Sequence, residues 1–469
     1  MAARSGDSRV EAATLCRLLG DWPEAGRTLP DALAAAISEL IDASVLHDGA
    51  ILPSQRVLAD TLGVSRVTVA EAYDLLSAGD LLAARQGSGS RVRSRPGTSL
   101  GTSNATEGRL ASHTGHQDRA IDLTSGALPG LPMVAATLAS LDRSALEDLV
   151  AGDGYFPAGL PVLREAIAAR YSRGGWPTEP DEVLVTGGAQ QAVWLIAHTL
   201  VSSGDEVVVE EPTYRGSLEA FRACGARLVA VPMTPTGLDV AHLEQLLARR
   251  RPCLLYIQPT AHNPTGVSLH NADRARLADL VQRHGVLTIE DTCSADVLLD
   301  PAARRAPWGA ILPDGPVLTV GTASKLPWGE LRVGWIRGSR SAVARLTEAR
   351  KAVDMSGPPL EQLLTARLLP HADEALEQRH TQLAAALARA NDALREVHPL
   401  WWWSPPSGGT GLWVDTGTDA VALAERGRRR GVRVVPGAAS SVFGGFGTHL
   451  RLPYWHPAKE FHEGLLRLL

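Results

Sequence analysis

The chain is poor in lysine. Of its 46 lysine and arginine residues only three are lysine: Lys325, Lys351 and Lys459. Any chemistry that needs a primary amine therefore has three candidates, because the guanidinium of arginine stays protonated and does not form imines. Cysteine is also scarce, and the four cysteines lie far apart without CxxC spacing. We therefore expect neither a disulfide framework nor a metal site. The cysteines are Cys16, Cys224, Cys253 and Cys293.

The sequence also lacks a strong net charge and a long apolar run. A net charge of −5 over 469 residues gives no overall attraction to nucleic acid or membranes, so any basic surface must be local. No apolar run approaches the length of a membrane span, and the N-terminus has no signal-peptide pattern. We therefore expect a cytoplasmic protein that does not contact a membrane. Its length suits two or three domains.

Three kinds of sequence follow one another along the chain. Residues 24–93 show a helical pattern followed by a short hairpin pattern. Residues 94–119 are rich in Ser, Gly, Thr, Asn and His without apolar periodicity, which is typical of a flexible linker. Residues 120–469 alternate short apolar runs with longer helical patterns. Such alternation predicts an α/β domain with a mostly parallel central sheet.

The N-terminal segment carries the pattern of a helix-turn-helix. We expect a first helix over 33–46, then a helix capped by Ser54 and ended by Gly63, and a third capped by Ser65. In this layout the first turn of the last helix carries the base-reading side chains, here Ser65, Arg66 and Thr68. Residues 81–92 follow as two short strands around a Gly-Ser-Gly turn, which predicts a wing that contacts phosphates or the minor groove. The alternative is that this segment does not bind DNA and is a small helical cap with solvated arginines.

The segment resembles the GntR-type winged helix. The shared pattern is an LPSxR turn, a VSRxTV recognition helix and a QGxGxxV wing, over about sixty residues. The resemblance implies that Arg56, Arg66 and the wing near Arg85, Gly87 and Gly89 lie against DNA.

Polar residues at successive strand ends of the larger region suit an anionic, planar cofactor. Gly188 follows the run EVLV and opens a helix, where glycine and free backbone amides can hold a phosphate. Asn263 and Asp291 each follow a predicted strand, at the edge where open α/β sheets bind ligands. A carboxylate can keep a pyridine nitrogen protonated, and Lys325 lies close in sequence to Arg332, which can pair with a phosphate.

The order of these motifs resembles the fold-type I aminotransferases from residue 121 onward, which implies pyridoxal 5'-phosphate as cofactor and a smaller C-terminal α/β subdomain. The resemblance implies that Lys325 forms a Schiff base with the cofactor and that Asp291 pairs with its ring nitrogen. Tyr214 would stack on the ring, and Asn263 would bind the phenolic oxygen. Arg451 would bind a ligand α-carboxylate. The implied phosphate contacts are Gly188, Ala189, Gln190, Ser324 and Arg332, and Tyr155 is implied to reach the cofactor of a partner subunit.

One position departs from that family. A tyrosine that binds the phenolic oxygen usually stands two residues after the aspartate, and here that position is Cys293. We expect the loss of this donor to change the pKa of the Schiff base and to disfavour efficient transamination.

A GntR-like winged helix followed by an aminotransferase-like domain resembles the MocR/GabR regulators over nearly the whole chain. The resemblance implies a homodimer, for which a head-to-tail arrangement is one option, that binds double-stranded operator DNA and responds to an amino-acid-like effector or to pyridoxal phosphate itself. Two alternatives stay open: an active aminotransferase with an appended DNA-binding domain, and a repressor whose large domain only dimerises and holds no cofactor.

Overall fold

The computed structural model describes residues 10–20, 22–23, 27–42, 46, 50–79, 81–85, 89–93, 120–141 and 143–469. The expected linker, 94–119, and Gly87 of the expected wing lie outside the described residues. None of the helices within these ranges is long and apolar enough to cross a membrane.

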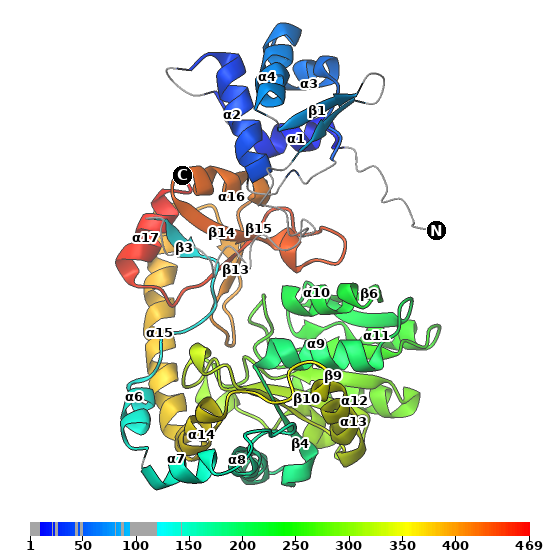
Figure 1. Ribbon diagram of the computed structural model, residues 1–469, viewed down its shortest axis with the longest axis vertical. Helices are drawn as coiled ribbons and strands as arrows, with labels where there is room; N and C mark the ends of the chain where they lie inside the picture. The colour runs from blue at the N-terminus through cyan, green and yellow to red at the C-terminus, as the bar shows by residue number, and fades with distance from the viewer. Residues whose placement is uncertain are drawn as a thin grey trace.

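The N-terminal part is a winged helix-turn-helix with one additional helix in front of it (Figure 1). Its elements are α1 (Ala12–Leu19), α2 (Leu29–Asp42), α3 (Gln55–Leu62), α4 (Arg66–Ala78), β1 (Leu82–Arg85) and β2 (Gly89–Val92). Ser54 and Ser65 cap α3 and α4 as expected, and Gly63, with φ 66°, ends α3. β1 and β2 form the antiparallel hairpin of the wing.

Two features of this part differ from expectation. The first predicted helix begins at Leu29, four residues earlier than expected, because Thr28 forms a hydrogen bond of 2.6 Å with Asp31 and Pro30 is tolerated in a first turn. No helix was predicted before residue 33, apart from the general pattern of 24–93, yet α1 places Leu15 and Leu19 fully inside the core of the winged helix.

The remaining chain forms two units, a large part and a smaller subdomain. The large part is built on an eight-stranded, mostly parallel sheet. In spatial order its strands are β4 (Val183–Thr186), β11 (Gly334–Arg337), β10 (Val317–Thr322), β9 (Leu287–Asp291), β8 (Leu254–Ile257), β5 (Glu206–Glu211), β6 (Arg227–Thr234) and β7 (Gly237–Leu238). Strands β6, β5, β8, β9 and β10 pair in parallel, whereas β11 pairs antiparallel with both β10 and β4. The apolar runs of β4, β8 and β10 are buried throughout, because helices cover both faces of the sheet.

The helices of the large part are α6 (Pro132–Ala139), α7 (Arg143–Val150), α8 (Pro161–Arg173), α9 (Ala189–Leu200), α10 (Arg215–Ala223), α11 (Val240–Leu247), α12 (Asn271–His284), α13 (Arg340–Lys351) and α14 (Pro359–Leu368). The polar strand ends lie on the carboxyl edge of the parallel strands, as parallel pairing requires.

The smaller subdomain lies between the large part and the winged helix (Figure 1). Its five-stranded sheet has the order β12 (Trp402–Trp403), β13 (Leu412–Asp415), β15 (His449–Leu452), β14 (Val432–Pro436) and β3 (Ile121–Leu123). Its helices are α15 (Ala372–Val397), α16 (Ala420–Arg429) and α17 (Ala458–Leu466). The edge strand β3 comes from the chain before the large part and pairs in parallel with β14.

Candidate functional site

A cavity lies where the carboxyl edge of the large sheet faces the smaller subdomain. It brings together three of the expected site residues, Asn263, Lys325 and Arg451. The remaining lining residues are Ala261, His262, Pro264, Gly266, Ser294, Gly408, Gly409, Thr410 and Gly411.

Lys325 follows β10 and points its amine at the chain segment that leads away from β3. Its Nζ donates a hydrogen bond of 2.6 Å to the carbonyl oxygen of Gly126. Burial, and secondly the positive charge of Arg451, lower the pKa of Lys325 to about 8. A larger share of its amine is therefore neutral near physiological pH than for a solvated lysine, which is the state that attacks a carbonyl.

Asp291, the last residue of β9, is buried with 3% of its surface exposed. Its carboxylate accepts hydrogen bonds from the Tyr256 hydroxyl at 2.6 Å and from the Cys293 amide at 2.9 Å. Burial and the neighbouring carboxylate raise the pKa of both the Tyr256 phenol and the Cys293 thiol, so the two groups stay neutral donors. Tyr256, on β8, was not anticipated; a tyrosine within the buried run CLLYIQP was its only signal.

The turn before α9 has the geometry of an anion cradle. Gly188 has φ 101°, and a Cβ on it would lie 3.0 Å from the guanidinium of Arg332. Arg332 donates a hydrogen bond of 3.0 Å to the carbonyl oxygen of Gly187, so its charge lies over the turn. Ala189 and Gln190 form the first turn of α9, whose leading amides have no partner within the helix. The side-chain oxygen of Gln190 is buried without a hydrogen-bond partner.

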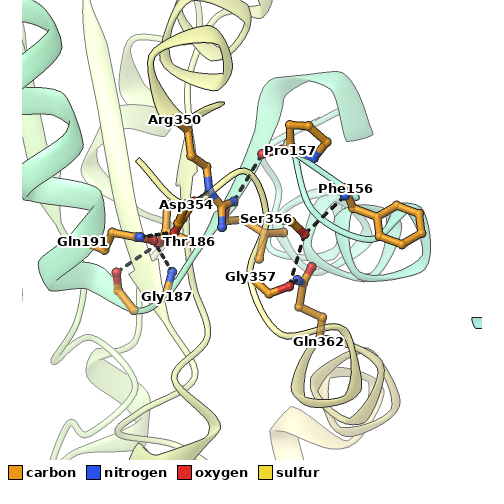
Figure 2. A network of polar contacts seen from close by, with 12 residues as sticks. Phe156, Pro157, Thr186, Gly187, Gln191, Arg350, Asp354, Ser356, Gly357 and Gln362 are labelled. Atoms are coloured by element: carbon orange, nitrogen blue, oxygen red, sulfur yellow. Dashed lines mark hydrogen bonds and ion pairs between the residues drawn. The ribbon is translucent and has the colours of Figure 1, made fainter. Parts of the chain in front are cut away.

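A network of buried and partly buried polar side chains supports the cradle (Figure 2). Gln191 accepts a hydrogen bond of 2.6 Å from the Gly187 amide and donates one of 2.5 Å to Asp354. Asp354 in turn accepts one of 2.8 Å from Arg350, which also donates to the carbonyl oxygen of Val185 at the end of β4. The position of Gly187 is therefore fixed by side chains as well as by the strand before it.

The same network reaches the loop that carries Tyr155. The amide of Phe156 donates a hydrogen bond of 3.2 Å to Ser356 (Figure 2). The amide of Leu160 donates one of 2.8 Å to Gln362. Tyr155 itself is 59% exposed and does not line the cavity of its own chain.

The other expected residues lie around Lys325. Asn263 accepts a hydrogen bond of 3.1 Å from Arg451, which comes from β15 of the smaller subdomain. Tyr214 precedes α10 at the end of the β5 loop, and its phenol contributes to the electrostatic environment of Arg451. The hydroxyl of Ser324 lies 3.0 Å from that of Thr322, directly before the lysine.

Arg379 is a second residue that the sequence did not reveal. It lies on α15 with 2% of its surface exposed and donates to the carbonyl oxygens of Leu326, Pro327 and Pro129. These bonds fasten the segment after Lys325 to the segment after Gly126. Burial lowers the pKa of Arg379 to about 10.

The winged helix exposes Arg56, Ser65 and Arg66 at the starts of α3 and α4. Thr68 is buried, and its hydroxyl lies 2.9 Å from that of the capping residue Ser65. Val67, which was not anticipated, is 63% exposed beside Arg66. Arg85, the last residue of β1, is paired with Gly89, the first residue of β2.

The donor set fits pyridoxal phosphate. A cradle at a helix N-terminus with an arginine over it suits a phosphate dianion. A buried carboxylate suits a protonated ring nitrogen, and an amine with a lowered pKa suits an aldehyde.

Comparisons with known proteins agree with both parts. Residues 118–468 match the model of the family "Aminotransferase class I and II", and residues 29–92 match "Bacterial regulatory proteins, gntR family". The uncharacterized HTH-type transcriptional regulator YjiR of Escherichia coli is 27% identical over 93% of this chain and 96% of its own length. The probable rhizopine catabolism regulatory protein MocR of Rhizobium meliloti is 32% identical over 61% of this chain and 60% of that protein.

Among solved structures, LysN, an alpha-aminoadipate aminotransferase of Thermus thermophilus complexed with N-(5'-phosphopyridoxyl)-L-leucine, superimposes with a TM-score of 0.67. It is 29% identical and covers 74% of this chain and 91% of its own. The expected fold and cofactor, pyridoxal phosphate, are thereby confirmed. The chain belongs to the aminotransferase class I and II family, and a GntR-type winged helix precedes that domain.

Proposed function

We propose that this chain is a transcription regulator that binds operator DNA through its winged helix and senses an amino compound, or pyridoxal phosphate itself, in its aminotransferase-like domain. One observation carries the proposal. The same chain holds an exposed arginine on a capped recognition helix and a lysine of lowered pKa close to a buried carboxylate.

We assign a residue of this chain to each contact with pyridoxal phosphate. When bound, pyridoxal phosphate supplies a carbonyl that captures primary amines and a ring that withdraws electrons. Lys325 provides the amine that attaches it, and Asp291, supported by Tyr256, keeps a proton at the ring nitrogen. Tyr214 covers the ring face, and Asn263 binds the phenolic oxygen. The proposed phosphate contacts are Gly188, Ala189, Gln190, Ser324 and Arg332.

Arg451 selects the effector in this proposal. Its guanidinium lies between Asn263 and Thr410, at 3.1 and 3.2 Å, and faces the cavity near Lys325. A planar, bidentate donor at this place suits a carboxylate, so the effector is an amino acid or a compound like one. Such a ligand would contact Arg451 of the smaller subdomain and the side of the cavity that carries Lys325. It can shift DNA affinity because it favours one arrangement of the two sides over another.

On the DNA side, Arg66 and Ser65 are proposed to reach base edges and Arg56 a phosphate. Thr68 acts through Ser65, because its hydroxyl is turned to that residue. The wing is proposed to contribute through Arg85, Gly87 and Gly89.

A homodimer is part of the proposal. Tyr155, Val353 and Met355 expose 59%, 49% and 45% of their surface, and they lie on two loops that the Phe156–Ser356 hydrogen bond joins. Exposed apolar side chains gathered in this way are typical of an interface. A partner subunit would place its Tyr155 at the neighbouring cofactor. A head-to-tail arrangement, the boundaries 24–93, 94–119 and 120–469, and a cytoplasmic location are proposed with it.

The experiment that tests the function combines two measurements on the full chain. Amino compounds are screened for a change in the visible absorbance of the bound cofactor, and binding to the DNA upstream of the gene is measured with each. We expect at least one α- or γ-amino acid to change both. If compounds change the absorbance and none changes the DNA affinity, sensing of an amino compound is refuted.

A second candidate is a DNA-binding aminotransferase, favoured by the intact Lys325 and Asp291. It requires turnover with an amino donor and a 2-oxo acid. Sustained turnover at ordinary enzyme rates would establish it and would remove the purely regulatory proposal.

A further inference from the structure

Gln258 directly follows β8 and is buried, with 4% of its surface exposed. Its backbone amide donates a hydrogen bond of 2.9 Å to the carboxylate of Glu210 on β5, which is itself 2% exposed. The beginning of the loop that leads to Asn263 is thereby tied to the neighbouring parallel strand. A glutamine in such a place needs partners for both ends of its side-chain amide, because a buried donor or acceptor without a partner is costly.

Both ends of the Gln258 side chain find partners beside the cofactor site. Its Nε2 donates a hydrogen bond of 3.2 Å to the hydroxyl of Tyr256. Its Oε1 accepts one of 3.1 Å from the backbone amide of Asn263. The orientation of the side-chain amide is unambiguous, because a backbone N–H can only donate and therefore requires the oxygen on its side. The amino group must then face Tyr256.

The donation from Gln258 sets the direction of the Tyr256 hydroxyl. A phenol carries one proton, and with an amino group donating to its oxygen that proton is directed to the carboxylate of Asp291, at 2.6 Å. Hydrogen bonds in such a chain polarise one another, so the donation from Gln258 strengthens the bond from Tyr256 to Asp291. Gln258 thus acts on the carboxylate assigned to the ring nitrogen without touching it.

The other end of the Gln258 side chain holds the backbone of Asn263 in place. Only residues 259–262 separate the two, so the side chain closes a short loop on itself. The Asn263 side chain is oriented from the opposite side, because the Nε of Arg451 can only donate and therefore faces the oxygen of Asn263, at 3.1 Å. The amino group of Asn263 is then the part that can donate to the phenolic oxygen of the cofactor. A shift of the Asn263 backbone would displace this donor.

We propose that Gln258 is a positioning residue for pyridoxal phosphate. Its single amide group directs the Tyr256 hydroxyl to Asp291 and holds the backbone of Asn263, so the contacts assigned to the ring nitrogen and to the phenolic oxygen share one support. The inference rests on the proposed function, from which it takes these two cofactor contacts. It depends neither on the identity of the effector nor on DNA binding.

The link to Asn263 is tested by spectrophotometric titration of the full chain loaded with pyridoxal phosphate. A donor at the phenolic oxygen stabilises its charged form and so lowers the pH midpoint of the visible absorbance. Gln258→Met removes both hydrogen bonds at similar side-chain length and should raise the midpoint by at least about 0.5 unit. When Asn263 is also replaced by alanine, Gln258→Met should cause no further shift, because the donor that it displaces is already absent.

The link to Tyr256 is tested by a double-mutant cycle on cofactor affinity. Equilibrium dialysis measures how tightly the cofactor-free protein binds pyridoxal phosphate. Tyr256→Phe and Gln258→Met should each weaken binding at least about threefold. The double variant should lose at least about twofold less than the product of the two single losses, because both substitutions interrupt one chain of hydrogen bonds. Tyr171→Phe is the matched control. It removes a buried hydroxyl that accepts a hydrogen bond from Trp335 at 2.9 Å, and it should bind like the wild type.

The substitutions leave the charged side chains in place, so a shift of the midpoint reports hydrogen bonding. Tyr256 is itself neutral, because burial and the charge of Asp291 raise its pKa. The charged or titratable groups around the chain of hydrogen bonds, which stay in place, are Glu210, Tyr214, His262, Asp291, Cys293, Lys325 and Arg451.

Gln258→Thr leaves room for a water and is made as well, in case Gln258→Met does not fold. The same midpoint shift is expected, because a water does not hold the Asn263 backbone in one place. A wild-type midpoint in the folded variant would overturn the inference, as would an equal shift with and without the Asn263 side chain. Fully additive losses of affinity would also overturn it, and a loss of stability alone would identify Gln258 as purely structural.

The outcomes separate this inference from the proposed function. If Asn263→Ala moves the midpoint and the Gln258 variants do not, the inference is refuted and the cofactor contact of Asn263 stands. If Asn263→Ala itself keeps the wild-type midpoint, that contact of the proposed function is refuted, and the inference with it.

Discussion

The lowered pKa of Lys325 predicts how cofactor loading depends on pH. With a pKa of about 8, the neutral fraction of this amine is roughly 0.1 at pH 7 and roughly 0.9 at pH 9. Because the neutral amine is the nucleophile, the rate constant for binding pyridoxal phosphate covalently should rise about 10-fold over this range and then level off. A solvated lysine, with a pKa of about 10.4, would give a rise of about 100-fold that continues to pH 10.

Stopped-flow absorbance on the cofactor-free protein, with pyridoxal phosphate in excess, measures this rate constant. Arg451→Gln is the informative variant, because the charge of Arg451 contributes to lowering the pKa of Lys325. Its plateau should begin at a higher pH. Lys325→Ala should give no saturable visible band, although Lys351 and Lys459 remain. A wild-type rate that climbs about tenfold for each pH unit up to pH 10 would refute the buried, desolvated amine.

The lowered pKa of Lys325 also makes the stability of the cofactor-free protein depend on pH. Between pH 8 and about 10.4 the unfolded chain binds more protons at Lys325 than the folded chain does. The free energy of unfolding of the cofactor-free protein should therefore rise with pH through this window, and Lys325→Met should remove that contribution. Urea unfolding at pH 8 and pH 10 measures it.

Three further predictions concern other parts of the chain. Arg66→Ala should weaken DNA binding by roughly 5- to 150-fold and leave the cofactor absorbance unchanged. Arg283→Ala, the control, should bind DNA like the wild type. If Arg66→Ala also binds DNA like the wild type, Arg66 is excluded from the interface. Cys293→Tyr should lower the pH midpoint of the visible absorbance by about 1 to 2 units, because a hydrogen bond to a charged oxygen contributes about 1.5–3 kcal/mol; an unmoved midpoint in spectrophotometric titration would place position 293 away from that oxygen. Gly188→Ala should weaken pyridoxal phosphate binding at least about tenfold in equilibrium dialysis, because φ is 101° at this position and the added Cβ would meet Arg332. Gly175→Ala is the control, because φ is 86° there but the added Cβ would lie in open space. Equal losses of binding in the two variants would refute the cradle.

The sequence was sufficient for the elements whose signals are local. The runs EVLV, EVVVEE and LTIED became strands that are buried over most of their length. Asp291 ends β9 and Asn263 follows β8, and parallel pairing of these strands places both residues at the same edge of the sheet. The capping residues Ser54 and Ser65 predicted the starts of α3 and α4, because an N-cap hydrogen bond joins residues that are close in sequence.

What the sequence did not reveal depends on contacts between distant segments. Tyr256 looked like one more apolar strand residue until β8 paired with β9 and brought its hydroxyl to Asp291. Arg379 lies more than fifty residues from Lys325 and acts through backbone oxygens, which leave no mark in a sequence. Helix α1 is eight residues long and acquires its partners, α3 and α16, only in the folded chain.

The edge strand β3 has a consequence for the order in which the protein becomes complete during synthesis. It is among the first segments made after the winged helix, yet its partner β14 lies far along the chain. Asp122 of β3 forms its ion pair with Arg433, 311 residues later. Because domains generally fold as units while the chain emerges, the winged helix can fold long before the smaller sheet closes. In a nascent or truncated chain, a folded winged helix can thus exist before the smaller subdomain is complete.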